Sequence, residues 1–227
     1  MTQLALAAFV FVAMHILPAI SARDAIVRKI GDPAYMGLFS LASFLGLAWL
    51  AHAYVQAPAS EPLWITGQAV RWCSAIVMLV AFTMLVCGVF TKNPTSVLGK
   101  GALKGRNEWN DIFAITRHPV MWAVAIWAAV HLVNRPDAAS LLFFGSLAFL
   151  AIAGTLRQEA RKRAELGAAW DKFASQTSFV PFAGLLSGKA RLNWRELADW
   201  PLAIAVFLWA AMLHFHGTIF GVYPVTF

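Results

Sequence analysis

Apolar residues of this chain gather into six long runs, which short polar segments separate. The runs fall at about 3–20, 34–56, 70–91, 118–134, 138–156 and 199–216. Each run is close to the ~20 residues that an α-helix needs to cross ~30 Å of hydrocarbon. The pattern therefore predicts an all-α fold, a polytopic membrane bundle of six transmembrane helices that forms a single domain over residues 1–227.

The segments between the last three runs carry two further signals. Only residues 134–137 join the fourth run to the fifth, which predicts a tight helical hairpin. After the fifth run, residues 156–198 form the longest piece that does not span. Its apolar residues recur at helical spacing, and basic residues occupy the other side. We therefore expect a cytoplasmic amphipathic helix that continues the fifth span along the membrane surface and ends near Pro181 and Gly184.

The composition agrees with a membrane protein. The chain is 60% hydrophobic and only 13% charged, whereas soluble domains carry about a quarter charged residues. The net charge is +7, but the basic residues lie in short loops between apolar runs and not on a polar domain. This distribution argues against nucleic acid as a partner and favours the lipid bilayer. Cys73 and Cys87 lie in one apolar run, about 21 Å apart by helical rise, so they cannot pair with each other.

The basic residues decide the expected orientation. Sixteen of the 18 lysines and arginines lie in the segments that follow the first, third and fifth runs, and only Arg71 and Arg135 lie on the opposite side. Because positive charge concentrates in cytoplasmic loops, both termini are expected in the periplasm of a bacterial inner membrane.

Histidines in the apolar runs are the first candidates for chemistry. Ionisable groups inside a membrane are costly and are often functional, and imidazole is a usual axial ligand of haem iron. Each histidine alone is equally compatible with packing between helices. Helical rise places His15 and His118 in the inner half of the membrane and His52 and His131 in the outer half.

The sequence Thr116-Arg117-His118-Pro119 opens the fourth run. Proline suits a first helical turn, Thr116 suits the N-cap, and Arg117 either snorkels to the headgroups or binds an anionic group. Beyond the fifth run, Glu159 is expected to make a surface pair with Arg163. Residues 110–111 are expected in a solvated loop. No nucleophile–base arrangement, Cys-x-x-Cys pair or glycine-rich phosphate loop is present.

Several motifs in one order carry a resemblance to a known family. They are His15 with 21–24 and Gly31, Glu108-Trp109, Ile115 to Pro119, Ala129-Val130-His131, Gln176 to Phe182, and His216 with Gly221. With these motifs the chain resembles the NnrU proteins of bacteria, which are related to the plant and cyanobacterial 15-cis-zeta-carotene isomerases. The likeness spans nearly the whole chain.

The resemblance implies a six-span bundle that holds haem b, with His15 and His131 as the axial ligands and Arg117 beside a haem propionate. Membrane depth pairs the histidines differently, so His118 and His52 stay competing ligands. The implied context is denitrification, through nitrite and nitric oxide reduction, or isomerase-like chemistry on an apolar small molecule. Ala128 stands where the isomerases carry a cysteine, which argues against redox-gated isomerisation.

A second likeness connects the chain to small membrane methyltransferases that act on isoprenylcysteine or phospholipid. Like this chain, they have an Arg-His-Pro motif at the start of a span, a tight helical hairpin and then a helix with a Glu…Gly…aromatic pattern. In this chain that pattern is matched by Glu159, Gly167, Trp170 and Phe173. Gln158 replaces one member of their usual glutamate pair. This reading places S-adenosylmethionine near Arg117, His118 and Glu159. A third reading is a non-catalytic assembly factor, so catalysis and oligomeric state stay open.

Overall fold

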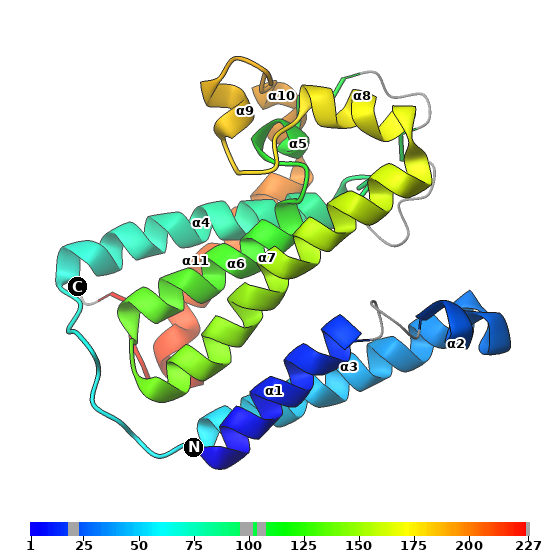
Figure 1. The fold of residues 1–227 in the computed structure, drawn as a ribbon. Helices are drawn as coiled ribbons and strands as arrows, with labels where there is room; N and C mark the ends of the chain where they lie inside the picture. The colour runs from blue at the N-terminus through cyan, green and yellow to red at the C-terminus, as the bar shows by residue number, and fades with distance from the viewer. Residues whose placement is uncertain (18–22, 96–101, 104–107, 226–227) are drawn as a thin grey trace. The chain divides into compact units, whose positions relative to one another are not determined.

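The computed structural model describes residues 1–17, 23–95, 102–103 and 108–225, and every regular element within these ranges is a helix (Figure 1). The helices divide between two compact units, and the boundary falls within α6 and α7. Unit 1 contains Met1–Ile65 and His131–Leu150, and unit 2 contains Thr66–Val130 and Ala151–Phe227. The predicted all-α class is confirmed, and each unit is described below by itself.

Within the described ranges, four helices are long and apolar enough to cross a membrane. They are α3 (Asp32–Val55), α4 (Gln68–Phe90), α7 (Ala138–Leu166) and α11 (Trp200–Phe220). The first and fourth predicted spans form shorter apolar helices, α1 (Thr2–Leu17) and α6 (Pro119–Asn134). The chain is therefore a membrane protein with several apolar helices, and six as the number of spans stays a prediction.

In unit 1, α1 packs antiparallel against α3. Gly46 permits the close approach, because a Cβ there would stand 3.0 Å from the Met14 sulfur and 3.2 Å from the Phe11 ring. Helix α2 (Arg23–Ile30) precedes α3, and an ion pair of 2.9 Å joins Arg23 to Asp32. The sequence pattern gave no sign of α2, since this segment was expected as a loop.

The tight hairpin between α6 and α7 is confirmed, because α6 ends at Asn134 and α7 begins at Ala138. Asp137 caps α7: its Oδ1 accepts from the Ser140 backbone N–H at 2.7 Å, and its Oδ2 accepts from Arg135 at 2.8 Å. Burial raises the pKa of Asp137, but these hydrogen bonds outweigh it and hold the pKa below its usual value. The carboxylate form therefore stabilises this turn.

In unit 2, α4 and α11 lie side by side (Figure 1). The Trp209 indole N–H donates to the Ala75 carbonyl at 2.8 Å, and the rings of Phe90 and Trp200 are 4.9 Å apart. A buried core joins the end of α4 to the short helices α5 (Ile112–Ile115), α8 (Ala168–Gln176) and α10 (Trp194–Leu197), and α9 (Ala183–Leu186) follows α8 in the chain. Its buried members are Met84, Cys87, Trp109, Ile112, Phe113, Ile115, Ala123, Trp170, Phe173 and Leu197.

Two local expectations need correction. The solvated loop at residues 110–111 is wrong for Asp111, which is buried and caps α5 by accepting from the Phe113 N–H at 3.1 Å. The single amphipathic helix after the fifth span is divided. Helix α7 continues to Leu166, Gly167 then adopts φ +51°, and α8 begins at Ala168. A positive φ is easy only for glycine, so this residue sets the break.

Candidate functional site

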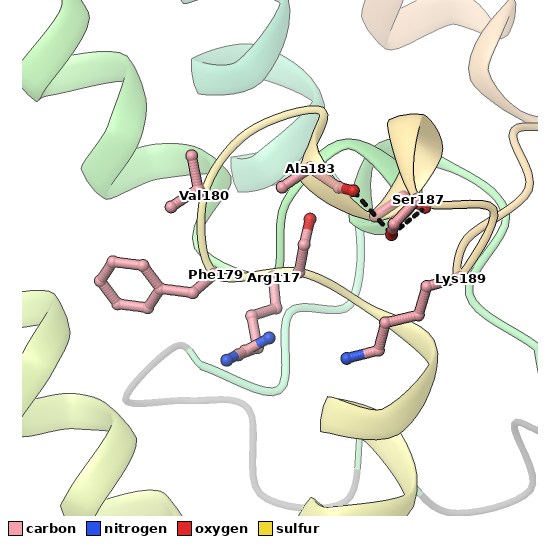
Figure 2. A pocket seen from close by; sticks show the side chains of 8 residues that line it. Arg117, Phe179, Val180, Ala183, Ser187 and Lys189 are labelled. Carbon is pink, nitrogen blue, oxygen red and sulfur yellow. Dashed lines mark hydrogen bonds between the residues drawn. The ribbon is translucent and has the colours of Figure 1, made fainter.

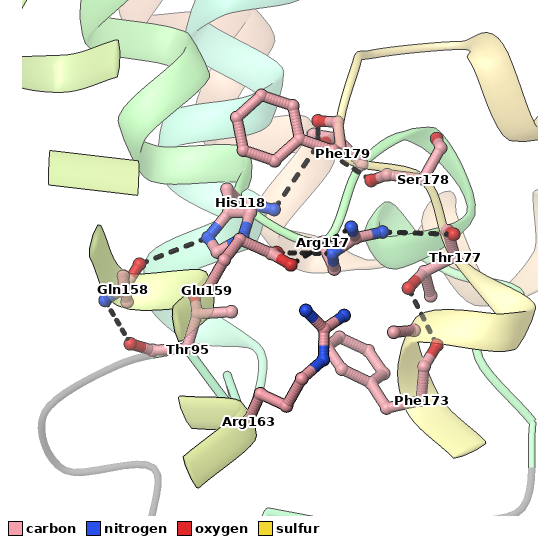
Figure 3. A network of polar contacts seen from close by, with 12 residues as sticks. Thr95, Arg117, His118, Gln158, Glu159, Arg163, Phe173, Thr177, Ser178 and Phe179 are labelled. Carbon is pink, nitrogen blue, oxygen red and sulfur yellow. Dashed lines mark hydrogen bonds and ion pairs between the residues drawn. The ribbon is translucent and has the colours of Figure 1, made fainter. Parts of the chain in front are cut away.

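A buried polar network lies in unit 2, where the segment before α6 meets α7 (Figure 3). Arg117 and His118 come from that segment, and Gln158 and Glu159 come from α7. His118 is 1% exposed and Arg117 is 9% exposed. Because Pro119 begins α6 and is itself buried, the two residues directly before it lie at a buried helix start instead of on a free surface.

The Arg117 guanidinium forms a two-pronged pair with Glu159. Its Nε–H donates to Oε1 at 2.5 Å, and its Nη2–H donates to Oε2 at 3.2 Å. A third N–H, on Nη1, donates to the Thr177 carbonyl at 3.2 Å. Since a guanidinium has five N–H donors, one remains on each terminal nitrogen. The expected surface pair of Glu159 with Arg163 is wrong: Arg163 instead pairs with Asp171 at 3.3 Å, because Glu159 turns toward the buried Arg117.

Both ring nitrogens of His118 are engaged. Nε2 lies 2.5 Å from Glu159 Oε1, and Nδ1 lies 3.1 Å from Gln158 Oε1. The Gln158 amide nitrogen donates to the Thr95 carbonyl, which fixes the amide so that its oxygen faces His118. An amide oxygen and a carboxylate are both acceptors, so each ring nitrogen of His118 faces an acceptor. In this arrangement neither ring nitrogen is open to a metal.

The segment 177–182 holds the network in place. The Thr116 hydroxyl donates to the Phe179 carbonyl at 2.7 Å, and the Arg117 backbone N–H donates to the Ser178 carbonyl at 2.9 Å. The Phe182 N–H donates to the Ile115 carbonyl at 2.8 Å. Two motifs that lie about 60 residues apart in the sequence therefore form one structural unit.

Two tryptophans beside His118 have unsatisfied donors. The Trp170 ring centroid is 6.4 Å from that of His118, and Trp122 follows His118 by one helical turn. Trp170 is fully buried, yet within the described part of the chain neither its indole N–H nor that of Trp122 has an acceptor. Each unsatisfied donor costs about 1–3 kcal/mol. Trp122 was not a predicted site residue, and its sequence context gives no signal for this role.

His15 lies elsewhere, in unit 1. Its Nδ1–H donates to the Phe11 carbonyl at 2.7 Å, and its ring packs against Phe11 and Phe39 at centroid distances of 4.5 and 5.4 Å. With the proton on Nδ1, the Nε2 atom carries the lone pair. Metal-bound histidines commonly adopt this arrangement, with the other nitrogen held by a carbonyl, so His15 suits a metal ligand.

His131 also belongs to unit 1, but at a different level. Its ring stacks on Phe144 at 4.7 Å, and Phe144 contacts Tyr54 of α3 at 5.7 Å. His15 contacts Phe39, which lies about 22 Å of helical rise from Tyr54 on the same helix. Two imidazoles on one metal have nitrogens about 4 Å apart.

The contacts of His15 and His131 therefore lie at different levels of α3, and this pair as the ligands of one haem stays a prediction. The competing ligand His52 lies on the exposed side of α3. Among the described residues, no group of three or more histidine, cysteine, aspartate or glutamate side chains could hold a metal ion.

Comparison with known proteins gives one match. A family model described as NnrU protein matches residues 3–224, which is nearly the whole chain and runs through both units. No curated protein matches, and no solved structure matches. The match confirms the NnrU part of the resemblance, while the relation to carotene isomerases stays a prediction.

Proposed function

The chain belongs to the NnrU family, and we propose that the Arg117–Glu159–His118 network is the working site of this membrane protein. One observation carries the proposal: the fully buried Trp170 indole N–H beside the network has no acceptor among the described residues. A buried donor without a partner calls for an explanation. A bound ligand whose oxygen accepts from this N–H would be such an explanation. The Trp122 indole N–H, which also has no acceptor among the described residues, is a second donor of the same kind.

The donors of the network favour an acceptor with negative charge. Arg117 carries a positive charge, which Glu159 meets from one side. Arg117 also has two N–H donors beyond its described bonds to Glu159 and Thr177. A carboxylate matches such a donor set, because charge-assisted hydrogen bonds to guanidinium are the stronger kind.

S-adenosylmethionine is the cofactor that this arrangement supports best. It carries a carboxylate at one end, and the residues behind the methyltransferase likeness converge on this network: Arg117, His118, Glu159, Trp170 and Phe173. When bound, the cofactor would supply a methyl group from its sulfonium to a nucleophile of a membrane-soluble acceptor. Gln158, in place of a second glutamate, orients His118 by bonding both its ring and the Thr95 carbonyl.

The proposed orientation in the membrane rests on the distribution of basic residues. Arg117 belongs to the segment after the third apolar run and Glu159 to the segment after the fifth, and these two segments hold most of the lysines and arginines. Positive charge is retained on the cytoplasmic side of a membrane. We therefore propose that the network faces the cytoplasm from a bacterial inner membrane, with both termini in the periplasm.

Titration calorimetry with S-adenosylmethionine on the protein purified in mild detergent tests the cofactor. We expect saturable binding, which Trp170→Phe weakens about tenfold through the loss of one hydrogen bond. Because Trp170 is fully buried in the core, the smaller ring also leaves a cavity, so we expect stability to fall by about 1–3 kcal/mol and compare the affinities well below the unfolding temperature. Trp194→Phe is the matched control, since Trp194 is 68% exposed. The absence of binding heat, or equal affinities in both variants, would contradict the proposal.

A second candidate is a haem b protein, and the tautomer of His15 favours it. The bond from Nδ1–H to the Phe11 carbonyl leaves Nε2 for iron. His131 contacts unit 1 at another level of α3, so in this candidate His15 is the histidine that would hold the haem. When bound, the haem would supply redox chemistry, and the suggested roles in denitrification or isomerisation belong to this candidate.

Oxidised and dithionite-reduced absorption spectra test the haem candidate. We expect a Soret band in the purified protein that His15→Ala abolishes and His131→Ala retains. His214→Ala serves as the control, because His214 is exposed on α11. Loss of the band in His131→Ala as well would show that the helices rearrange to bring both rings to one iron, and the single-ligand candidate would then be wrong.

A further inference from the structure

An open hollow of about 310 Å³ lies beside the network, within unit 2 (Figure 2). The Arg117 guanidinium and the Lys189 amine extend toward the same space (Figure 2). Apart from these two cations, the described lining consists of hydroxyl and apolar residues, and it contains no carboxylate. The lining residues are Arg117, Ser178, Phe179, Val180, Ala183, Gly184, Ser187 and Lys189.

The two cations make the hollow suited to an anion. Arg117 meets Glu159 on the network side and has two N–H donors beyond its described bonds, one on each terminal nitrogen, so one can bind an anion in the hollow while the other binds the cofactor carboxylate. The Lys189 amine donates to the Ala174 carbonyl at 2.8 Å, which orients the amine without neutralising it. Like charges at one site repel, so an anion between them is stabilised by both. A phosphate oxygen is a strong acceptor for both groups.

The shape of the hollow is set by close packing. Gly184 lies where a Cβ would stand 3.1 Å from the Ala190 side chain and 3.2 Å from the Ser178 hydroxyl. Phe182, just before α9, is held at φ +65°, which non-glycine residues rarely adopt. Its backbone N–H bond to the Ile115 carbonyl fixes this conformation. Strained backbone of this kind often accompanies binding sites.

Exposed apolar side chains lie in the segments that line the hollow. Val180 belongs to the lining and is 51% exposed. Phe182 and Leu186 directly precede the lining residues Ala183 and Ser187, and they are 38% and 87% exposed. A cationic floor with an apolar rim, in a protein of membrane-spanning helices, matches the boundary between lipid headgroups and acyl chains. A soluble anion would make no use of this rim.

We propose that the hollow binds the phosphate group of an anionic phospholipid, with Arg117 and Lys189 as the phosphate contacts. Val180 and Leu186 then lie against the start of the acyl chains. The proposal goes beyond the cofactor site, because Lys189 takes no part in the network around Glu159. Free phosphate would meet the same donors, so the experiment compares the two sources.

Thermal unfolding of the delipidated protein in mild detergent, with phosphatidylglycerol, phosphatidylcholine or inorganic phosphate added in turn, tests the proposal. We expect phosphatidylglycerol to raise the unfolding temperature by several degrees and phosphatidylcholine to leave it unchanged. Lys189→Gln should raise the half-saturating phosphatidylglycerol concentration about tenfold, since one charge-assisted contact is lost. Arg191→Gln, the same charge change at an exposed residue outside the lining, should have no such effect.

Three outcomes would overturn the proposal. The first is equal stabilisation by both lipids, and the second is full stabilisation by millimolar inorganic phosphate with no effect of phosphatidylglycerol. The third is an equal loss in Lys189→Gln and Arg191→Gln, which would indicate diffuse surface charge. Lys189→Gln should bind S-adenosylmethionine as the unchanged protein does, so a failure of the lipid site is distinguishable from a failure of the cofactor site.

Discussion

Replacing Glu159 with glutamine is expected to lower the free energy of unfolding by about 3–5 kcal/mol. The carboxylate accepts two bonds from Arg117 and one from His118, and the exposed fractions of the three side chains are 13%, 11% and 0%. Glutamine keeps the size of the side chain but not its charge. The Arg117 guanidinium would then be buried without its counter-charge, which is the costly way to break a buried ion pair.

Thermal unfolding in mild detergent, followed by circular dichroism, measures this loss. Glu165→Gln is the control on the same helix, because Glu165 is exposed and its described ion pair with Lys162 is long, at 3.6 Å; the change should cost less than about 1 kcal/mol. The double change Arg117→Met with Glu159→Leu should recover most of the loss, since it removes both charges of the pair. Equal costs for the two glutamate variants would show that the network is hydrated and contributes little.

The sequence predicts the helices of this fold better than the long-range contacts between their side chains. Two apolar runs with four residues between them predict the hairpin at residues 134–137, and the length of the runs predicts helices instead of strands. The break at Gly167 has a local signal, a glycine inside a helical pattern, which the amphipathic interpretation passed over. Local spacing also explains the incorrect pairing of Glu159, because an i,i+4 neighbour is visible in sequence, whereas Arg117 lies 42 positions away.

In the candidate site, too, local sequence predicts single residues but not the contacts between them. Arg117 and His118 stand out in the sequence because they open an apolar run, but nothing local indicates that Gln158 fixes the His118 ring through the Thr95 carbonyl. The unpaired donors of Trp122 and Trp170 depend on packing from three segments, so they are visible only in three dimensions. Helical rise alone already predicts different membrane depths for His15 and His131. The contacts in unit 1 agree with this difference, because His15 contacts Phe39 near the start of α3, whereas His131 stacks on Phe144, which contacts Tyr54 near its end.

Substituting alanine for Gly88 is the second change with a large expected effect. A Cβ at Gly88 would stand 2.7 Å from Pro119 Cγ, 3.0 Å from Pro119 Cβ and 3.1 Å from a Val120 methyl. Pro119 is buried, and its ring cannot rotate away as a flexible side chain does. Helix α6 must therefore move away from α4, and overpacking of this kind costs about 1–3 kcal/mol.

The same displacement should reach the network, because His118 directly precedes Pro119. We therefore expect Gly88→Ala to lower the unfolding temperature and to weaken S-adenosylmethionine binding together, as thermal unfolding and calorimetry on one preparation would measure. Gly145→Ala is the matched control: it lies in helix α7 with no atom within 4 Å of the added Cβ, and alanine there should stabilise the helix by up to about 1 kcal/mol.

If Gly88→Ala behaved like Gly145→Ala, α4 and α6 would not be in close contact, and the rigid support proposed for His118 would be absent. If stability fell while binding persisted, the ligand would not depend on the position of His118, and the network would hold the helices together without forming the binding site.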